Sequence, residues 1–263
     1  MLPEEEKRQI QLVELEILDE FERLCRLGGL RYYIIAGTLL GAVRHKGFIP
    51  WDDDMDVAMP RKDFERFFTF CQTALAPEFF FQSLETDQNC PFFHYKLRKN
   101  GTFVEEPGLK KIEMHKGIFI DIFPLDGCPE KDLSGKLFFK WFEQLRSGIQ
   151  AQVNPDFVCG YTKSYARATH TLIKKLPRSV LIGIWKLTSR ISSLCFKKKL
   201  CTVCGRHGYP GETYQTAWYQ ETVFLDFEGR KLPAPAGWDA MLTNLYGDYM
   251  TPPPESERQG HFE

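Results

Sequence analysis

The 263-residue sequence contains no apolar run that approaches the roughly 18 residues of a membrane-spanning helix. It begins with an acidic segment, Met1 to Glu6, where a signal peptide would be basic, and no apolar segment follows. We therefore expect a cytoplasmic protein. Its charges nearly cancel, at 34 Lys+Arg against 35 Asp+Glu, and 43% of the residues are hydrophobic. That composition predicts a globular protein with a core and excludes coiled coil and general disorder.

Acidic residues are absent between positions 157 and 211, although this segment carries eleven Lys and Arg residues. Apolar residues such as Leu181, Trp185 and Ile191 recur there at helical spacing, which predicts a basic amphipathic helix. Such a helix can be a solvated face, a docking surface for an anionic polymer, or one for an anionic membrane. No nucleic-acid-binding motif accompanies the charge, so we expect no nucleic-acid partner.

Cysteines are few and offer no metal framework. There are eight, and the one C-x-x-C, Cys201 and Cys204, has His207 three residues further on. A structural zinc site needs four ligands at recognisable spacings, so we do not expect zinc and predict ordinary thiols.

The hydrophobic patterns predict an α+β fold, with a sheet in the first half and helices in the second. Predicted helices cover 4–27, 39–43 and 61–75; predicted strands cover 31–36, 54–59, 79–84, 92–98, 102–105 and 117–123. Long helical segments follow Pro129.

Two aspartates, Asp54 and Asp56, alternate with core-forming Met and Val residues in the strand 54–59. Side chains alternate between the faces of a strand, so these two carboxylates share one face. They repel each other, and a bound Mg²⁺ or Mn²⁺ removes the conflict. A third carboxylate, Asp121, lies inside an otherwise apolar strand, where it is costly unless paired or metal-bound. If the two strands are neighbours, the three carboxylates converge on one metal centre.

These aspartates have two rival interpretations. A calcium-binding EF-hand loop starting at Asp52 fails, because its sixth residue is Val57 instead of Gly and its twelfth is Asp63 instead of Glu. A glycosyltransferase D-x-D motif remains the alternative within enzymes, although only about fifty residues precede Asp54. Upstream, Gly37 and Thr38 stand between a strand and a helix, where backbone N–H groups can bind phosphate.

The order of strand, Gly-Thr, helix, Asp-x-Asp and later strand Asp resembles the nucleotidyltransferase fold, and in particular the LicD family of phosphorylcholine transferases, relatives of fukutin and fukutin-related protein. The blocks that carry the resemblance are 36–45, 49–57, 95–102, 115–126 and 245–254. The resemblance implies a mixed-sheet catalytic core over residues 1–130 and a mainly helical, basic acceptor-binding lobe over 131–263, whose aromatic and proline-rich end closes on the core.

The resemblance also implies an activity: transfer of phosphorylcholine from CDP-choline, or of another phospho-alcohol from its CDP derivative, to a sugar of a cell-surface glycan such as teichoic acid or lipopolysaccharide. CMP is released, and one or two Mg²⁺ or Mn²⁺ ions are held by Asp54, Asp56 and Asp121, the predicted catalytic residues. Gly37 and Thr38 would contact the nucleotide phosphates.

Further residues complete this prediction. Cations close to the motifs could hold phosphate; they are Arg44, His45, Lys96, Arg98 and Lys116. Aromatic residues could surround choline; they are Tyr246, Tyr249, Trp218, Tyr219 and Trp238. The basic lobe suits an anionic or lipid-linked glycan and contact with the inner membrane surface. The alternative outside enzymes is a catalytically silent module that binds a glycan.

Overall fold

The computed structural model describes residues 3–154, 173, 175–258, 260 and 262. Lys163, Arg167 and Lys174 of the acid-free segment lie outside these residues. The helices are α1 (Glu4–Gly28), α2 (Ala36–His45), α3 (Arg61–Ala74), α4 (Asp132–Val153), α6 (Arg178–Cys195), α7 (Gly208–Gly211) and α8 (Trp238–Tyr246). The strands are β1 (Tyr33–Ile34), β2 (Asp56–Pro60), β3 (Phe79–Gln82), β4 (Tyr95–Lys99), β5 (Phe119–Cys128), β6 (Lys199–Cys201), β7 (Thr213–Gln215), β8 (Thr222–Phe227) and β9 (Arg230–Pro235). Short 3₁₀ turns cover Thr216–Tyr219 and Glu255–Glu257.

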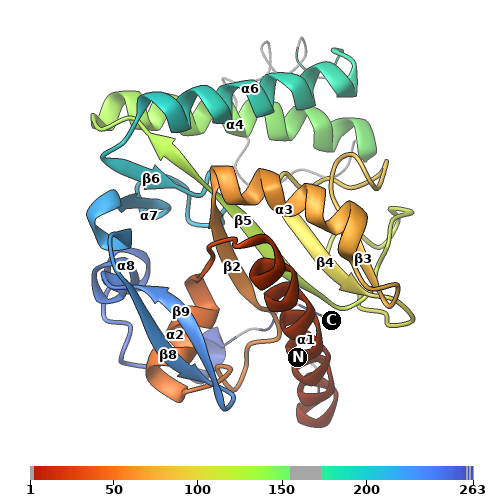
Figure 1. The fold of residues 1–263 in the computed structure, drawn as a ribbon, viewed down its shortest axis with the longest axis vertical. Helices are drawn as coiled ribbons and strands as arrows, with labels where there is room; N and C mark the ends of the chain where they lie inside the picture. Colours follow the sequence, from red (N-terminus) through yellow and green to blue (C-terminus); the bar gives the residue numbers. More distant parts are fainter. Residues whose placement is uncertain (1–2, 155–172, 174, 259, 261, 263) are drawn as a thin grey trace.

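The fold is α+β, as the sequence predicts, and is built around a mixed sheet (Figure 1). Its strand order is β1-β2-β5-β4-β3, with β2 and β5 parallel and the other pairs of this path antiparallel. Strand β5 is long enough to pair a second time, through Asp126 to Cys128, with β6, which in turn pairs with β7. The prediction that the sheet is confined to the first half is therefore wrong in this detail.

Apolar periodicity explains how the first helices pack. On α1, Ile17, Phe21 and Leu24 are fully buried, and α3 buries Phe64 and Phe67 on the same side of the sheet. Rings from the two helices meet, with the Phe21 and Phe67 centroids 5.1 Å apart. The left-handed Gly29 ends α1, with its N–H bonded to the carbonyl of Arg26.

Residues 102–105, predicted as a strand, form none. Thr102 takes over the hydrogen bonds that a strand partner would make: its Oγ1 donates to the Lys99 carbonyl at 2.8 Å and accepts from Ile118 N–H at 2.9 Å. A side chain that bonds to nearby backbone in this way competes with a regular ladder.

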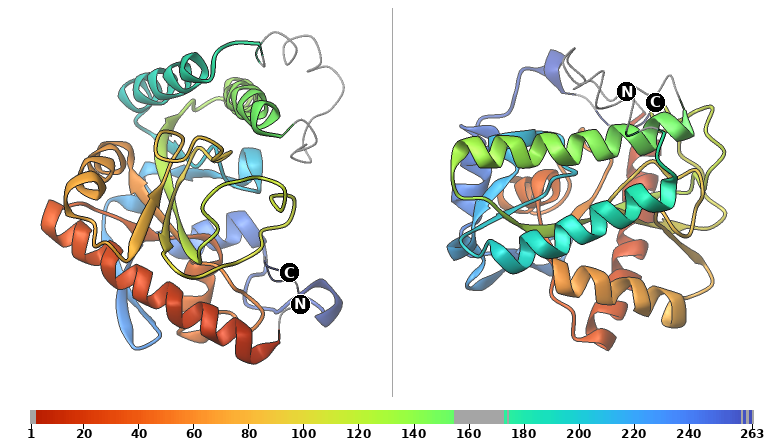
Figure 2. Two further views of the ribbon diagram at one scale, coloured as in Figure 1. Left: turned by 90° about the vertical axis from the view of Figure 1, so that its right-hand side faces the viewer. Right: turned by 90° about the horizontal axis from the view of Figure 1, so that it is seen from above.

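The chain after residue 130 divides between two hydrophobic cores. Helices α4 and α6 lie side by side across one end of the sheet (Figures 1 and 2), and bury Phe142, Leu145, Leu181 and Trp185 in a core of their own. The β8–β9 hairpin and α8 instead join the core of the first half, through residues such as Phe227 and Met241. The boundary at residue 130 stays a prediction, because later segments share the first core.

Candidate active site

A row of polar side chains crosses the middle of the sheet. Asp56 of β2 is paired in register with Asp121 of β5, and Asp121 is paired on its other side with Lys96 of β4. The Asp121 N–H donates to the Met55 carbonyl at 2.8 Å, which holds the two acidic strands together. The strands of Asp56 and Asp121 are therefore neighbours, as the three-carboxylate hypothesis requires, and Asp54 lies two residues before β2 begins.

Asp54, Asp56 and Asp121 line a cavity of about 750 Å³, a volume that is ordinary for a small-molecule site. Lys96 is buried and is not on the cavity wall. Of the predicted site residues, those on this wall are Gly37, Arg44, Asp54, Asp56, Asp121, Tyr246 and Tyr249. The cavity wall also includes Asp52, Trp51 and His94, together with Arg146 of α4 and Arg206, so acidic and basic groups face the same space.

The Asp121 carboxylate has two cationic or polar neighbours. Lys96 Nζ lies 2.8 Å from its Oδ1, and His94 Nε2 lies 3.2 Å from the same oxygen. Burial by itself would raise the pKa of Asp121, but Lys96 and then His94 outweigh it and hold the pKa below its usual range. Asp121 is therefore an ionised carboxylate and a weak base.

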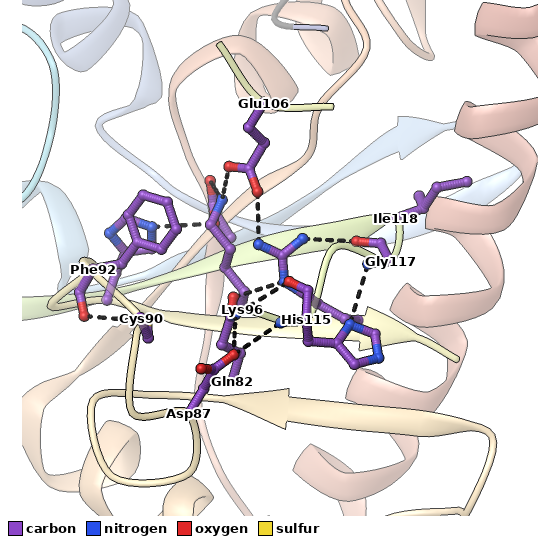
Figure 3. A network of polar contacts seen from close by, with 12 residues as sticks. Gln82, Asp87, Cys90, Phe92, Lys96, Glu106, His115, Gly117 and Ile118 are labelled. Carbon is purple, nitrogen blue, oxygen red and sulfur yellow. Dashed lines mark hydrogen bonds and ion pairs between the residues drawn. The ribbon is translucent and has the colours of Figure 1, made fainter. Parts of the chain in front are cut away.

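Arg98 and Lys116 do not reach the cavity. Arg98 is fully buried and donates to Gln82 Oε1 at 2.6 Å, to the Gly117 carbonyl at 2.7 Å and to Glu106 Oε1 at 2.6 Å. Glu106 also lies 3.2 Å from Lys96 Nζ (Figure 3). Arg98 thus holds in place the Glu106 carboxylate that pairs with Lys96. Lys116 instead donates to the Lys110 carbonyl at 2.7 Å.

The Gly-Thr pair at the start of α2 serves two different purposes. A Cβ on Gly37 would lie 2.6 Å from Asp52 Oδ2, so the glycine lets this carboxylate reach the first turn of the helix. Thr38 is buried, and its Oγ1 accepts from the Asp56 N–H at 2.8 Å, which ties α2 to β2. Thr38 thus positions Asp56 and is not on the cavity wall.

The remaining predicted residues lie as follows. His45 is exposed, and its Nε2 accepts from Arg44 Nε at 2.9 Å. The three aromatic residues that do not line the cavity, Trp218, Tyr219 and Trp238, pack against the first core. Tyr246 and Tyr249 remain beside the site, with Trp51, Phe92 and Phe123 on the same wall.

Sequence reasoning missed Glu14 and His94. Glu14 on α1 is fully buried, and neither carboxylate oxygen has a hydrogen-bond partner among the described residues. Burial first, and then the negative charge of Asp54, raises its pKa well above the usual range. Glu14 could have been found from the sequence, because it is an acid inside the apolar stripe of a helix. No sequence pattern pointed to His94, a lone histidine before Tyr95.

Comparisons with known proteins agree with this geometry. Residues 29–140 match the family model "LicD/FKTN/FKRP, nucleotidyltransferase domain", a range that contains β1 to β5 and all three aspartates. The chain is 29% identical to lipopolysaccharide cholinephosphotransferase LicD of Haemophilus influenzae, over 97% of this chain and 95% of that protein. It is also 41% identical to an uncharacterized protein of Rickettsia typhi, over 22% of this chain and 18% of the relative.

The similarity to a cholinephosphotransferase over nearly the whole chain indicates a transferase enzyme, and residues 29–140 form its nucleotidyltransferase domain. Within that class, residues 29–140 match the LicD/FKTN/FKRP nucleotidyltransferase domain, and the chain is similar to the Haemophilus LicD protein over nearly its whole length.

Proposed function

We propose that this protein transfers phosphorylcholine from CDP-choline to a hydroxyl of a lipopolysaccharide-like glycan and releases CMP. The observation that carries the proposal is the in-register pair of Asp56 and Asp121 on the wall of a cavity that Gly37 also lines, with Lys96 of the next strand paired to Asp121. The Haemophilus relative, named for this transfer, matches over nearly the whole chain. Transfer to teichoic acid, or from another CDP-alcohol, uses the same phosphoryl chemistry and is tested alongside.

The donor set suits a divalent cation that binds partly through substrate. The described residues contain no group of three or more His, Cys, Asp or Glu side chains placed to hold a metal ion. Mg²⁺, however, commonly binds through one or two carboxylates and completes its shell with water and substrate phosphates. We assign Asp54 and Asp56 as the protein ligands of Mg²⁺ or Mn²⁺, which would neutralise charge on the transferred phosphoryl group. Asp121 as a third ligand stays a prediction, because Lys96 already lies beside it.

The protein's own part in the reaction is to position the reactants and balance charge. A sugar oxygen bonds to phosphorus, the bond from phosphorus to the CMP oxygen breaks, and the hydroxyl proton is released to water. Arg44, Arg146 and Arg206 on the cavity wall can bind the phosphates. Asp121 can orient the hydroxyl by accepting its hydrogen bond.

Recognition of choline needs aromatic faces around a quaternary ammonium. Tyr246 and Tyr249 lie on the cavity wall with Trp51, Phe92 and Phe123, and carboxylates are close by. This combination of ring faces and negative charge favours a cationic alcohol over uncharged ribitol.

Release of CMP, measured with a panel of glycans, tests the proposal. The protein is incubated with Mg²⁺ or Mn²⁺ and with CDP-choline, CDP-ribitol or a UDP-sugar. We expect CMP from CDP-choline, and a loss of at least about 100-fold in Asp54→Asn and Asp56→Asn, as when a charge-stabilising group is removed. Asp226→Asn, an exposed acid of β8, is the control.

Other outcomes would identify the alternatives. Release of UDP from the UDP-sugar, with no CMP from either CDP-alcohol, would indicate a D-x-D glycosyltransferase. Glycan binding that is unchanged when both aspartates are replaced, with no CMP or UDP released from any donor, would indicate a glycan-binding module and refute the enzymatic proposal.

A further inference from the structure

Helix α6 has an apolar stripe that faces solvent. Val180, Leu187, Ile191 and Leu194 are 43%, 60%, 50% and 72% exposed, and their spacings of seven, four and three residues place them on one side of the helix. The opposite side buries Leu181 and Trp185. One face of the helix therefore packs into a hydrophobic core, and a second apolar face is exposed to water.

Helix α4 continues the same surface. Leu133, Leu137 and Trp141 are 73%, 57% and 41% exposed and recur every four residues. Trp141 Nε1 lies 3.5 Å from Thr188 Oγ1 of α6, so the two stripes are adjacent. Figures 1 and 2 show the two helices side by side at the outer edge of the molecule. We call these seven side chains the outer apolar face.

Lysines border the outer apolar face, and one of them, Lys198, is paired with Glu130 at 3.4 Å. Lys136 and Lys140 are exposed on α4, and Lys175, Lys197 and Lys198 lie just beyond the two ends of α6. No Asp or Glu occurs between 175 and 211.

Two cations on the flank of α6 form ion pairs with other elements. Arg190 Nε pairs with Glu65 at 2.8 Å, and Lys186 pairs with Glu85. These partly exposed ion pairs contribute little, and the burial of Leu181 and Trp185 is what turns the outer apolar face outward.

We propose that the outer apolar face docks on an anionic lipid surface. An apolar stripe with lysines at its border, lying flat with its apolar side in the headgroup layer, is the arrangement of an interfacial helix. Within the part of the chain that the structure describes, no helix is long and apolar enough to cross a membrane, so the contact is peripheral. A soluble polyanionic glycan would use the lysines but leave the seven apolar side chains in water. A second copy would bring lysines against lysines.

Docking would place the cavity next to the lipid surface. Arg146 and Gln150 lie on the inner side of α4, on the cavity wall, while Leu137 and Trp141 of the same helix face outward. A glycan attached to lipid would then lie close to the cavity. The docking itself does not depend on the reaction, and its test needs no substrate.

Sedimentation with lipid vesicles tests the apolar contribution. The full chain is mixed with vesicles of equimolar phosphatidylcholine and phosphatidylglycerol, and with vesicles of phosphatidylcholine alone. We expect binding to the anionic vesicles, and a partition coefficient at least about tenfold lower for the double variant Leu187→Gln/Ile191→Gln. Leu27→Gln is the matched control, because Leu27 is 59% exposed on α1, against 60% for Leu187. Its partition coefficient should change less than about twofold.

The lysines are tested by charge and by salt. Lys136→Gln and Lys140→Gln should each lower binding about fivefold at low ionic strength, and added salt should reduce that difference. Equal binding of wild type and Leu187→Gln/Ile191→Gln, or no preference for anionic vesicles, would overturn the proposal. A dimer that the same double variant dissociates, without vesicle binding by the wild type, would assign the face to a second copy and also overturn it.

Discussion

Glu14 offers a direct test of the electrostatics beneath the site. Its carboxylate is fully buried, without a hydrogen-bond partner among the described residues, and Asp54 is the first of its negative neighbours. The change Glu14→Gln keeps the shape of the side chain and removes the ability to ionise. We expect the variant to be more stable than wild type at neutral pH.

The sign and size follow from proton linkage. Between the ordinary carboxyl pKa and the raised pKa of Glu14, the folded protein keeps a proton that the unfolded chain has lost, so wild-type stability falls as pH rises. The slope is at most about 1.4 kcal/mol per pH unit, hence at most about 2.7 kcal/mol between pH 5 and pH 7. For a protein of this size, 1 kcal/mol corresponds to about 2–4 °C in melting temperature. The difference in melting temperature between Glu14→Gln and wild type should therefore be up to about 5–10 °C larger at pH 7 than at pH 5.

Differential scanning calorimetry across this pH range measures the effect. Glu20→Gln on the same helix is the control with the opposite sign. Burial would raise the pKa of Glu20, but hydrogen bonds from Arg23 and the Ala76 N–H lower it, so its loss should destabilise the protein at neutral pH. If the melting temperature of Glu14→Gln differs from that of wild type by the same amount at pH 5 and pH 7, Glu14 is not a buried acid with a raised pKa.

Two other predictions address the frame of the site. Asp126→Asn breaks a buried two-bond contact with Arg61, at 2.6 Å for each bond, and should lower the free energy of unfolding by about 3–5 kcal/mol in urea titration; a loss below about 1 kcal/mol would contradict it. Gly37→Ala, which brings a methyl group against Asp52, should abolish the thermal shift produced by CDP-choline, while Gly183→Ala on α6, where nothing lies within 4 Å, should leave it intact. Retention of the shift in Gly37→Ala would show that the first turn of α2 does not contact the donor.

Local patterns were enough to predict the elements that carry the aspartates. The 3.6-residue apolar period of α1 and the alternation in β2 and β5 each follow from residues that are neighbours in sequence. Met55, Val57 and Met59 are buried as predicted, which leaves Asp54 and Asp56 on the opposite side, at the cavity wall. The α+β class and the resemblance to LicD proteins followed from such blocks.

The tertiary structure decided the roles of the cations. Lys96 and Arg98 are two residues apart on β4 and equivalent by sequence, yet Lys96 meets Asp121 while Arg98 turns to Gln82 and Glu106. The difference depends on strand register, which local sequence does not encode, because pairing joins residues that are distant along the chain.

Solvent exposure divides in the same way. The sequence determined that Leu181, Trp185, Ile191 and Leu194 belong to one helix, but the structure buries the first two and exposes the others. Hydropathy records that a side chain is apolar, whereas burial requires a partner surface, and α6 has a partner for only one of its two apolar faces.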